Sequence, residues 1–153
     1  MMSPQSVDPH FRDLSQDEII AVLKRNQVGR LAYSFHDLVD IRPIHYVYDD
    51  NWLFGRTSPG DKLITLTHNQ WMVFEVDEIE GPLDWVSVIA RGSFYKTDPG
   101  GSDSQVKFHE RAVSRIRKLN PVAFTDSDPT RFRTEVFAIS IDSLSGRSCS
   151  TKG

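Results

Sequence analysis

Between residues 28 and 96 the chain alternates short runs of β-forming residues with tight turns. The clearest example is "DIRPIHYVYDDNWLFGR", in which Asp49, Asp50 and Asn51 separate two such runs. Asp and Asn are favoured in tight turns, so the two runs are predicted to form a hairpin. Strands that follow one another through short turns pair as antiparallel neighbours. This favours an antiparallel barrel over a parallel sheet built from βαβ units.

The rest of the chain fits a mainly β fold with helices at its periphery. Ser15 and Glu18 have the spacing of a capping box, which marks the start of a first helix. Pro43 lacks a backbone N–H donor, so its strand is predicted at an edge, at a bulge or where the sheet opens. We expect a single domain over 1–153, with flexible tails at 1–12 and 146–153. The predicted strands are 30–35, 40–50, 52–56, 70–79, 84–96 and 133–144, and the predicted helices are 15–27, 60–68 and 103–119.

Charge and composition argue against several classes of protein. The formal net charge is -3 and the isoelectric point is near 5.9, whereas a nucleic-acid-binding protein needs a basic surface. No long apolar run could span a membrane, and the N-terminus lacks the apolar core of a signal peptide. The single cysteine, Cys149, cannot form an intramolecular disulfide, so we expect a cytoplasmic protein. Cys149 lies in the polar stretch "SGRSCSTKG" and is expected to be an exposed thiol without a catalytic role.

The segment "WLFGRTSPGDKLITL" joins a predicted strand to the second predicted helix. Arg56 offers a planar pair of donors, Thr57 and Ser58 offer hydroxyl groups, and Lys62 adds a point charge. Gly60 lets the backbone approach a ligand closely, and a helix that begins there directs backbone N–H groups at the turn. These donors suit a monophosphate. An ordinary solvated turn explains the same residues, and composition alone favours that simpler interpretation.

Four segments in order resemble a known family. They are "VGRLAYS", "RPIHYVYDDNWLFGRTSPGDKL", "VFEVDEIEGPLDWVSVIARGSF" and "VFAISIDSLSGR". They are similar to the pyridoxamine 5'-phosphate oxidase-like superfamily, and most of all to its small FMN-binding members, which include nitroimidazole-reductase-like proteins. The resemblance implies a split barrel of antiparallel Greek-key type. It also implies a homodimer with an FMN site at the interface, and therefore favours the phosphate interpretation of the turn.

The same resemblance implies which residues bind the cofactor. Thr57 and Lys62 match the phosphate turn of the family, and Arg56 stands where some branches have His and others Arg. The strand before the turn is expected to pass the flavin ring and to contact it largely through its backbone. The "WVSV" segment matches one that lies near the cofactor across the dimer interface. The complete set of expected cofactor-binding residues is Arg42, Pro43, Ile44, His45, Arg56, Thr57, Ser58, Lys62, Trp85 and Ser87.

The function that this resemblance implies is electron transfer. We expect a flavoprotein oxidoreductase that passes electrons from a reduced nicotinamide through FMN to a small organic acceptor such as a nitroaromatic. The alternatives are a non-catalytic flavin-binding module for storage or sensing, and a reductase that uses a deazaflavin coenzyme. Genuine pyridoxamine 5'-phosphate oxidases have a basic C-terminal segment, and here only Arg147 and Lys152 remain. No catalytic acid, base or nucleophile is assigned, and no metal site is expected.

Overall fold

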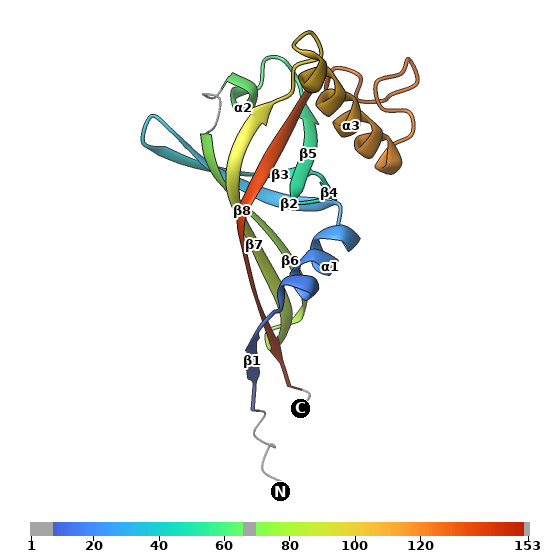
Figure 1. Ribbon diagram of the computed structural model, residues 1–153. Coiled ribbons are helices and arrows are strands. Elements are labelled where there is room, and N and C mark those ends of the chain that lie inside the picture. Colours follow the sequence, from blue (N-terminus) through green and yellow to red (C-terminus); the bar gives the residue numbers. More distant parts are fainter. Residues whose placement is uncertain (1–7, 66–69, 152–153) are drawn as a thin grey trace, which may run out of the picture.

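The computed structural model describes residues 8–65 and 70–151, which form one eight-stranded antiparallel sheet with three helices around it (Figure 1). The predicted mainly β fold is therefore confirmed. Parts of the predicted tails and of the second predicted helix lie outside the described residues, at 1–7, 152–153 and 66–69. The strands are β1 (His10–Asp13), β2 (Val28–Phe35), β3 (Leu38–His45), β4 (Val47–Asp49), β5 (Trp52–Thr57), β6 (Gln70–Gly81), β7 (Asp84–Lys96) and β8 (Glu135–Ser150). The helices are α1 (Gln16–Arg25), α2 (Lys62–Thr65) and α3 (Asp103–Leu119).

The sheet forms a barrel that does not close. Its strand order is β3-β2-β6-β7-β8-β5-β4, and β1 pairs with β8 outside this path. The pairs β2–β6 and β5–β8 join strands that are distant in the sequence, as in a Greek key. The two edge strands, β3 and β4, are nevertheless consecutive in the chain. The barrel is split between them, and the predicted split-barrel fold is confirmed.

Tyr46 marks the split. The prediction of one strand over 40–50 is wrong, because the structure ends β3 and begins β4 on either side of Tyr46. This residue is buried. Its backbone N–H donates to the carbonyl of Gln27 at 3.0 Å, and its hydroxyl donates to the carbonyl of Leu23 at 2.7 Å. These bonds fix the chain where it passes from β3 to β4. Pro43 lies in the edge strand β3, as predicted.

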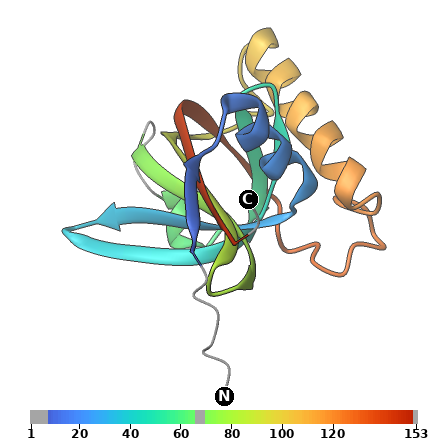
Figure 2. The ribbon, with the colours of Figure 1, turned by 90° about the horizontal axis from the view of Figure 1, so that it is seen from below.

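Two tight turns shape the edges of the barrel. Asp50 and Asn51, with φ of 44° and 70°, join β4 to β5 and confirm the predicted hairpin. His36 and Asp37, with φ of 49° and 65°, make a second hairpin between β2 and β3 that the sequence did not predict. Two-residue hairpins require this left-handed backbone, which Asn and Asp tolerate well. The β2–β3 hairpin extends well beyond the rest of the sheet (Figure 2).

The helices cover the rims of the barrel. Ser15 and Glu18 form the predicted capping box at α1, and Ser102 with Gln105 forms another at α3. The long helix α3 lies on the outside of β5 and of the first part of β8 (Figures 1 and 2). In the described part of the chain α2 has only four residues, so the predicted helix at 60–68 is not seen at that length. None of the helices within 8–65 and 70–151 is long and apolar enough to cross a membrane.

Parts of the predicted flexible tails form strands, at 10–12 and 146–150. β1 and the end of β8 pair with each other, so that His10 faces Ser150 in the register. The same end of β8 also pairs with β7, where Trp85 faces Cys149. The prediction of flexible tails is therefore wrong for 10–12 and 146–150, because strands on both sides supply hydrogen bonds that composition does not reveal. Cys149 is buried, with 1% of the residue exposed, so the prediction of an exposed thiol is also wrong.

The buried apolar side chains form two clusters. The larger one fills the barrel, with Phe74 and Phe94 among its fully buried aromatic residues. The smaller one lies between α3 and the outer side of β5 and β8, where Phe54 packs with Ala112 and Ile116. This second cluster fixes α3, and with it the start of the loop that leads to β8, against the open side of the barrel.

Candidate functional site

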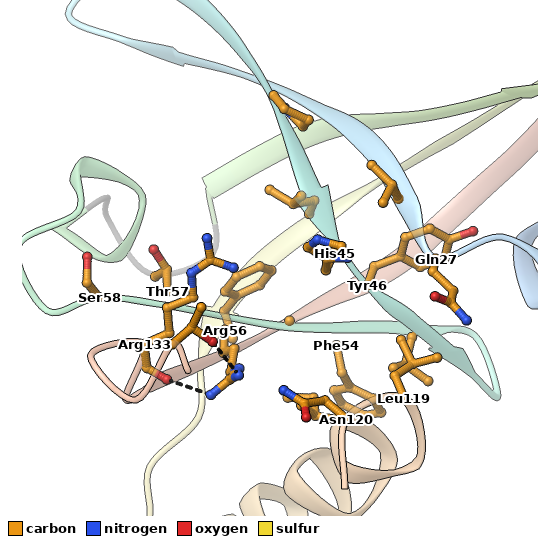
Figure 3. A pocket seen from close by; sticks show the side chains of 18 of the residues that line it. Gln27, His45, Tyr46, Phe54, Arg56, Thr57, Ser58, Leu119, Asn120 and Arg133 are labelled. Atoms are coloured by element: carbon orange, nitrogen blue, oxygen red, sulfur yellow. Dashed lines mark hydrogen bonds between the residues drawn. The ribbon is translucent and has the colours of Figure 1, made fainter. Parts of the chain in front are cut away.

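A pocket of about 680 Å³ lies at the split in the barrel (Figure 3). One wall consists of residues 42–47, from the end of β3 to the start of β4, and a second consists of residues 54–58 from β5 and its turn. The third wall comes from the end of α3, at Leu119 and Asn120, and from the loop that follows. In Figure 3 the pocket has a polar end with Arg56, Thr57, Ser58 and Arg133, and another end with Gln27, His45 and Tyr46.

At the polar end Arg42, Thr57 and the backbone N–H of Leu63 all donate to the carboxylate of Asp61. Arg42 donates from both terminal nitrogens, one of them at 2.7 Å. The Thr57 hydroxyl donates at 2.5 Å, and the backbone N–H of Leu63 donates at 2.9 Å. Arg42 comes from β3 and Thr57 from β5, so Asp61 also ties the two sides of the split together.

The pKa of Asp61 shows how strongly these donors favour a negative charge. Burial acts to raise it, but hydrogen bonds from Arg42, Thr57 and the Leu63 backbone outweigh burial and lower the pKa to about 2. Asp61 is therefore ionised at neutral pH. The same hydrogen bond raises the pKa of Arg42, so the pair is fully charged.

Arg56 makes different contacts from those expected of a phosphate ligand. Its two terminal nitrogens donate to the Asp128 carboxylate at 2.5 and 3.2 Å, to the Thr130 hydroxyl at 2.8 Å and to the Arg133 carbonyl at 3.5 Å. Its guanidinium carbon lies 5.0 Å from the centre of the Phe124 ring. Four of its five N–H donors are thus directed at the loop before β8. Arg56 fastens that loop to β5.

Asp128 lies in the same loop and binds both Arg56 and the backbone of the loop. Its side chain is fully buried, and it also accepts from the backbone N–H groups of Thr130 at 2.9 Å and Phe124 at 3.0 Å. The hydrogen bond from Arg56, followed by these backbone bonds, holds the pKa of Asp128 far below its ordinary value. The loop is thereby fixed as a wall of the pocket.

The structure brings most of the predicted cofactor-binding residues to this pocket, but not all. Lys62 is exposed at the start of α2 and does not line the cavity. Trp85 and Ser87 lie on β7, where the Ser87 hydroxyl donates to Glu75 at 3.1 Å and the Trp85 ring centre is 6.3 Å from that of Phe11. Their contact with a cofactor across a subunit interface stays a prediction. The predicted residues that line the pocket are Arg42, Pro43, Ile44, His45, Arg56, Thr57 and Ser58.

The sequence did not predict the third wall of the pocket or the role of Asp61 as the common acceptor at its polar end. Asp61 stands inside the quoted turn, and its position between Gly60 and Lys62 was a signal that could have been used. The wall residues gave no comparable signal, because "FTDSDPTRF" has the composition of an ordinary loop. The wall residues that were missed are Ile116, Leu119, Asn120, Pro129, Thr130, Phe132 and Arg133.

The donor set fits an anion with several oxygens. A guanidinium, a hydroxyl and a backbone N–H already surround one carboxylate, and the same groups are common ligands of phosphate in proteins. Next to them the pocket is lined by apolar residues that are not fully buried, such as Pro43 and Ile44. Among the described residues there is no group of three His, Cys, Asp or Glu side chains placed to hold a metal ion. The pocket therefore places polar donors and apolar side chains next to each other.

A split barrel with a pocket of polar donors at its opening defines a class of proteins, and comparison with known families identifies which one. The family profile described as pyridoxamine 5'-phosphate oxidase matches residues 15–148. The chain belongs to this family. A curated relative, an uncharacterized protein of Rhizobium meliloti, is 28% identical over 83 residues. That match spans 54% of this chain and 55% of the relative, so the chain covers about half the length of that protein.

Solved structures share the fold over nearly the whole chain. A FAD-binding protein from Mesorhizobium loti is 27% identical, with a TM-score of 0.71 over 92% of this chain and 99% of that one. The FAD binding protein from Mycobacterium smegmatis is 22% identical, with a TM-score of 0.65 over 90% of this chain and 98% of that one. At that lower identity the second likeness concerns the fold alone.

Proposed function

We propose that the chain binds a flavin nucleotide in the pocket at the split and acts as an oxidoreductase. The observation that carries this proposal is the convergence of Arg42, Thr57 and the Leu63 N–H on one anionic position beside a cavity of about 680 Å³. Ligand pockets of this size accommodate compounds as large as a nucleotide. Membership of the pyridoxamine 5'-phosphate oxidase family supports the same conclusion.

The residues of this chain would hold and orient the cofactor. The phosphate would take the donors that now serve Asp61, with the Ser58 hydroxyl beside them. The ring would lie along Pro43 and His45 at the edge of β3, where the strand has no further neighbour on one side. When bound, a flavin supplies reversible hydride and electron transfer, and the protein sets its position and surroundings. The proposed reaction takes electrons from a reduced nicotinamide to a small organic acceptor such as a nitroaromatic.

FMN is the flavin that the sequence resemblance favours, and FAD is supported by the name of the Mesorhizobium loti structure. A deazaflavin coenzyme would use a similar phosphate turn. The three are separated by titrating the purified protein with each cofactor and then by competition between them. Preference for the deazaflavin over both flavins would replace the flavin proposal.

A non-catalytic flavin-binding module is the second candidate, and the side-chain pairing in the pocket favours it. Arg42 is paired with Asp61, Arg56 is paired with Asp128, and the Tyr46 hydroxyl is buried against a carbonyl. None of these groups is placed as a general acid or base. The test is the rate at which reduced nicotinamide bleaches the bound flavin under anaerobic conditions. A rate no faster than that of the free flavin would favour the non-catalytic function.

We also propose that the chain forms a homodimer through the outer face of β2, β3 and β6. Ile41, Ala32 and Val73 lie side by side across these strands, and Val39 and Trp71 are on the same face. Val39 is 81% exposed, Ile41 61% and Trp71 50%, which is unusual for large apolar side chains unless another surface covers them. Light scattering should give twice the chain mass, and Ile41→Glu should give a monomer. A monomeric wild-type protein would exclude this assembly.

The oxidoreductase proposal has a direct test. The purified protein is loaded with flavin, and reduction by NADH and by NADPH is followed at the visible flavin band, with and without a nitroaromatic acceptor. Reduction much faster than for free flavin, followed by reoxidation by the acceptor, is the expected result. A protein that binds no flavin would overturn the whole proposal, whereas bound flavin without accelerated reduction would overturn only the catalytic part.

A further inference from the structure

The loop before β8 places an exposed aromatic ring and a guanidinium together at the mouth of the pocket. Phe132 lines the pocket and is 59% exposed. The guanidinium carbon of Arg133 lies 5.9 Å from the centre of the Phe132 ring, and Arg133 also lines the pocket. A large aromatic side chain left in solvent beside a cavity is a suitable stacking surface for a flat ring.

Of the three arginines that line this pocket, Arg133 is the one whose side chain is available to a ligand. Arg42 is paired with Asp61, and Arg56 is paired with Asp128. Within the described part of the chain no carboxylate pairs with Arg133. In Figure 3 it lies at the same end of the pocket as Thr57 and Ser58. A phosphate chain longer than one unit that starts at the turn would therefore meet a further cation there.

This wall is held in place without a ligand. Arg56 holds the loop against β5, because it donates both to Asp128 within the loop and to the backbone carbonyl of Arg133. The Phe124 ring lies against the same guanidinium. A recognition surface that is already ordered loses less entropy when a ligand binds.

We propose that Phe132 and Arg133 bind an adenosine diphosphate group, with the adenine on the Phe132 ring and the second phosphate on the Arg133 guanidinium. This inference rests on the proposed function, because the phosphate held at the turn is the first phosphate of FAD. If the group belongs to a nicotinamide dinucleotide, the turn holds the phosphate of FMN, and Phe132 and Arg133 contact only the adenine and one phosphate of the dinucleotide. Base stacking on an aromatic side chain is sequence-tolerant and substantial, and Arg grips phosphate with two parallel bonds. An adenosine diphosphate group occurs in FAD and in reduced nicotinamide dinucleotides. The wall selects a dinucleotide over a mononucleotide.

The experiment compares dissociation constants for FMN and FAD in the wild-type chain, Phe132→Ala, Arg133→Gln and the control Arg131→Gln. The control removes the same charge from an exposed neighbour that does not line the pocket. Titrations follow flavin fluorescence, and the melting temperature of each variant checks that it is folded. A parallel titration of NADH into FMN-loaded protein uses the same four proteins.

If the group belongs to FAD, the wild-type chain binds FAD more tightly than FMN. Phe132→Ala and Arg133→Gln then each raise the dissociation constant of FAD by roughly tenfold and that of FMN by less than about twofold. Arg131→Gln changes neither constant. If the group belongs to the nicotinamide donor, the two flavins bind alike and both pocket variants weaken NADH by a similar factor. Equal weakening of FMN and FAD, or no effect on any dinucleotide, overturns the inference while the flavin site stands. A chain that binds neither flavin overturns the proposed function as well.

Discussion

Replacing Asp61 with Asn tests the arrangement at the polar end of the pocket, because it keeps the shape of the side chain and removes its charge. Asp61 is the common acceptor of Arg42, Thr57 and the Leu63 backbone, and its side chain is 13% exposed. The cluster should therefore lose electrostatic stabilisation in the unliganded protein. The same change should leave its donors available to an incoming phosphate.

The expected loss of stability follows from the pKa of Asp61. Its fall from the ordinary 3.8 to about 2 sets an upper limit of about 2–3 kcal/mol, since one pKa unit corresponds to about 1.4 kcal/mol. Partial exposure to solvent screens some of this, so about 1–2 kcal/mol is expected at pH 7. Because the folded-state pKa is the lower one, the contribution is complete above about pH 4. It is lost as the pH falls through about 2.

The expected gain is in ligand affinity. A flavin phosphate and the Asp61 carboxylate compete for the same donors, and two anions so close repel each other. Asp61→Asn should therefore tighten the binding of FMN by roughly tenfold, or about 1.4 kcal/mol. This part of the prediction depends on the proposed flavin site.

Two measurements on each protein test both parts. Urea unfolding without ligand, at pH 7 and between pH 4 and 2, gives the free energy of unfolding, and fluorescence titration gives the dissociation constant of FMN. Asp126→Asn is the control, since it makes the same change of charge on an exposed loop residue. An Asp61→Asn variant as stable as the wild type would refute the energetic reasoning. A weaker affinity for FMN would show that Asp61 positions the donors for the ligand instead of competing with it.

Three further substitutions, with one control substitution, examine other parts of the account. Arg56→Gln should lower the melting temperature and make the loop before β8 more sensitive to proteolysis; an unchanged melting temperature would contradict its role as a fastener. Lys62→Ala should weaken FMN by about 1.5–3 kcal/mol if Lys62 makes a charge-assisted bond to the phosphate, and an unchanged dissociation constant would remove it from the site. Gly92→Ala should cost about 1–3 kcal/mol in unfolding free energy, because its Cβ would lie 1.9 Å from the Ser140 carbonyl oxygen at the β7–β8 bulge. Gly100→Ala, whose Cβ would meet nothing closer than 3.7 Å, should be nearly neutral, and equal losses at both glycines would argue against the close contact.

The features that the sequence predicted well depend on neighbouring residues. The capping box of Ser15 and Glu18 lies within one helical turn, and the Asp50–Asn51 turn lies between the strands that it joins. The edge was one of the three positions predicted for Pro43, because a missing N–H donor has a local consequence, and the structure places it there. Such signals can be read without knowing what else the chain contacts.

The features that the sequence did not predict depend on distant partners. Arginine is a residue type that often binds phosphate, and only the fold shows that Asp128, 72 residues away, accepts the hydrogen bonds of Arg56. The polar end of β8 is a strand because β7 and β1 pair with it on both sides. Phe132 and Arg133 become part of the site because the packing of α3 and the hydrogen bonds of Arg56 place their loop beside the split.

The central claim is that the pocket at the split holds a flavin by its phosphate. The most direct test is to titrate the purified protein with riboflavin, FMN and FAD under identical conditions and to compare the three dissociation constants. We predict that FMN and FAD bind with one flavin per chain and that riboflavin, which lacks the phosphate, binds at least tenfold more weakly. Equal affinity for riboflavin and FMN, or binding of none of the three, would contradict the claim.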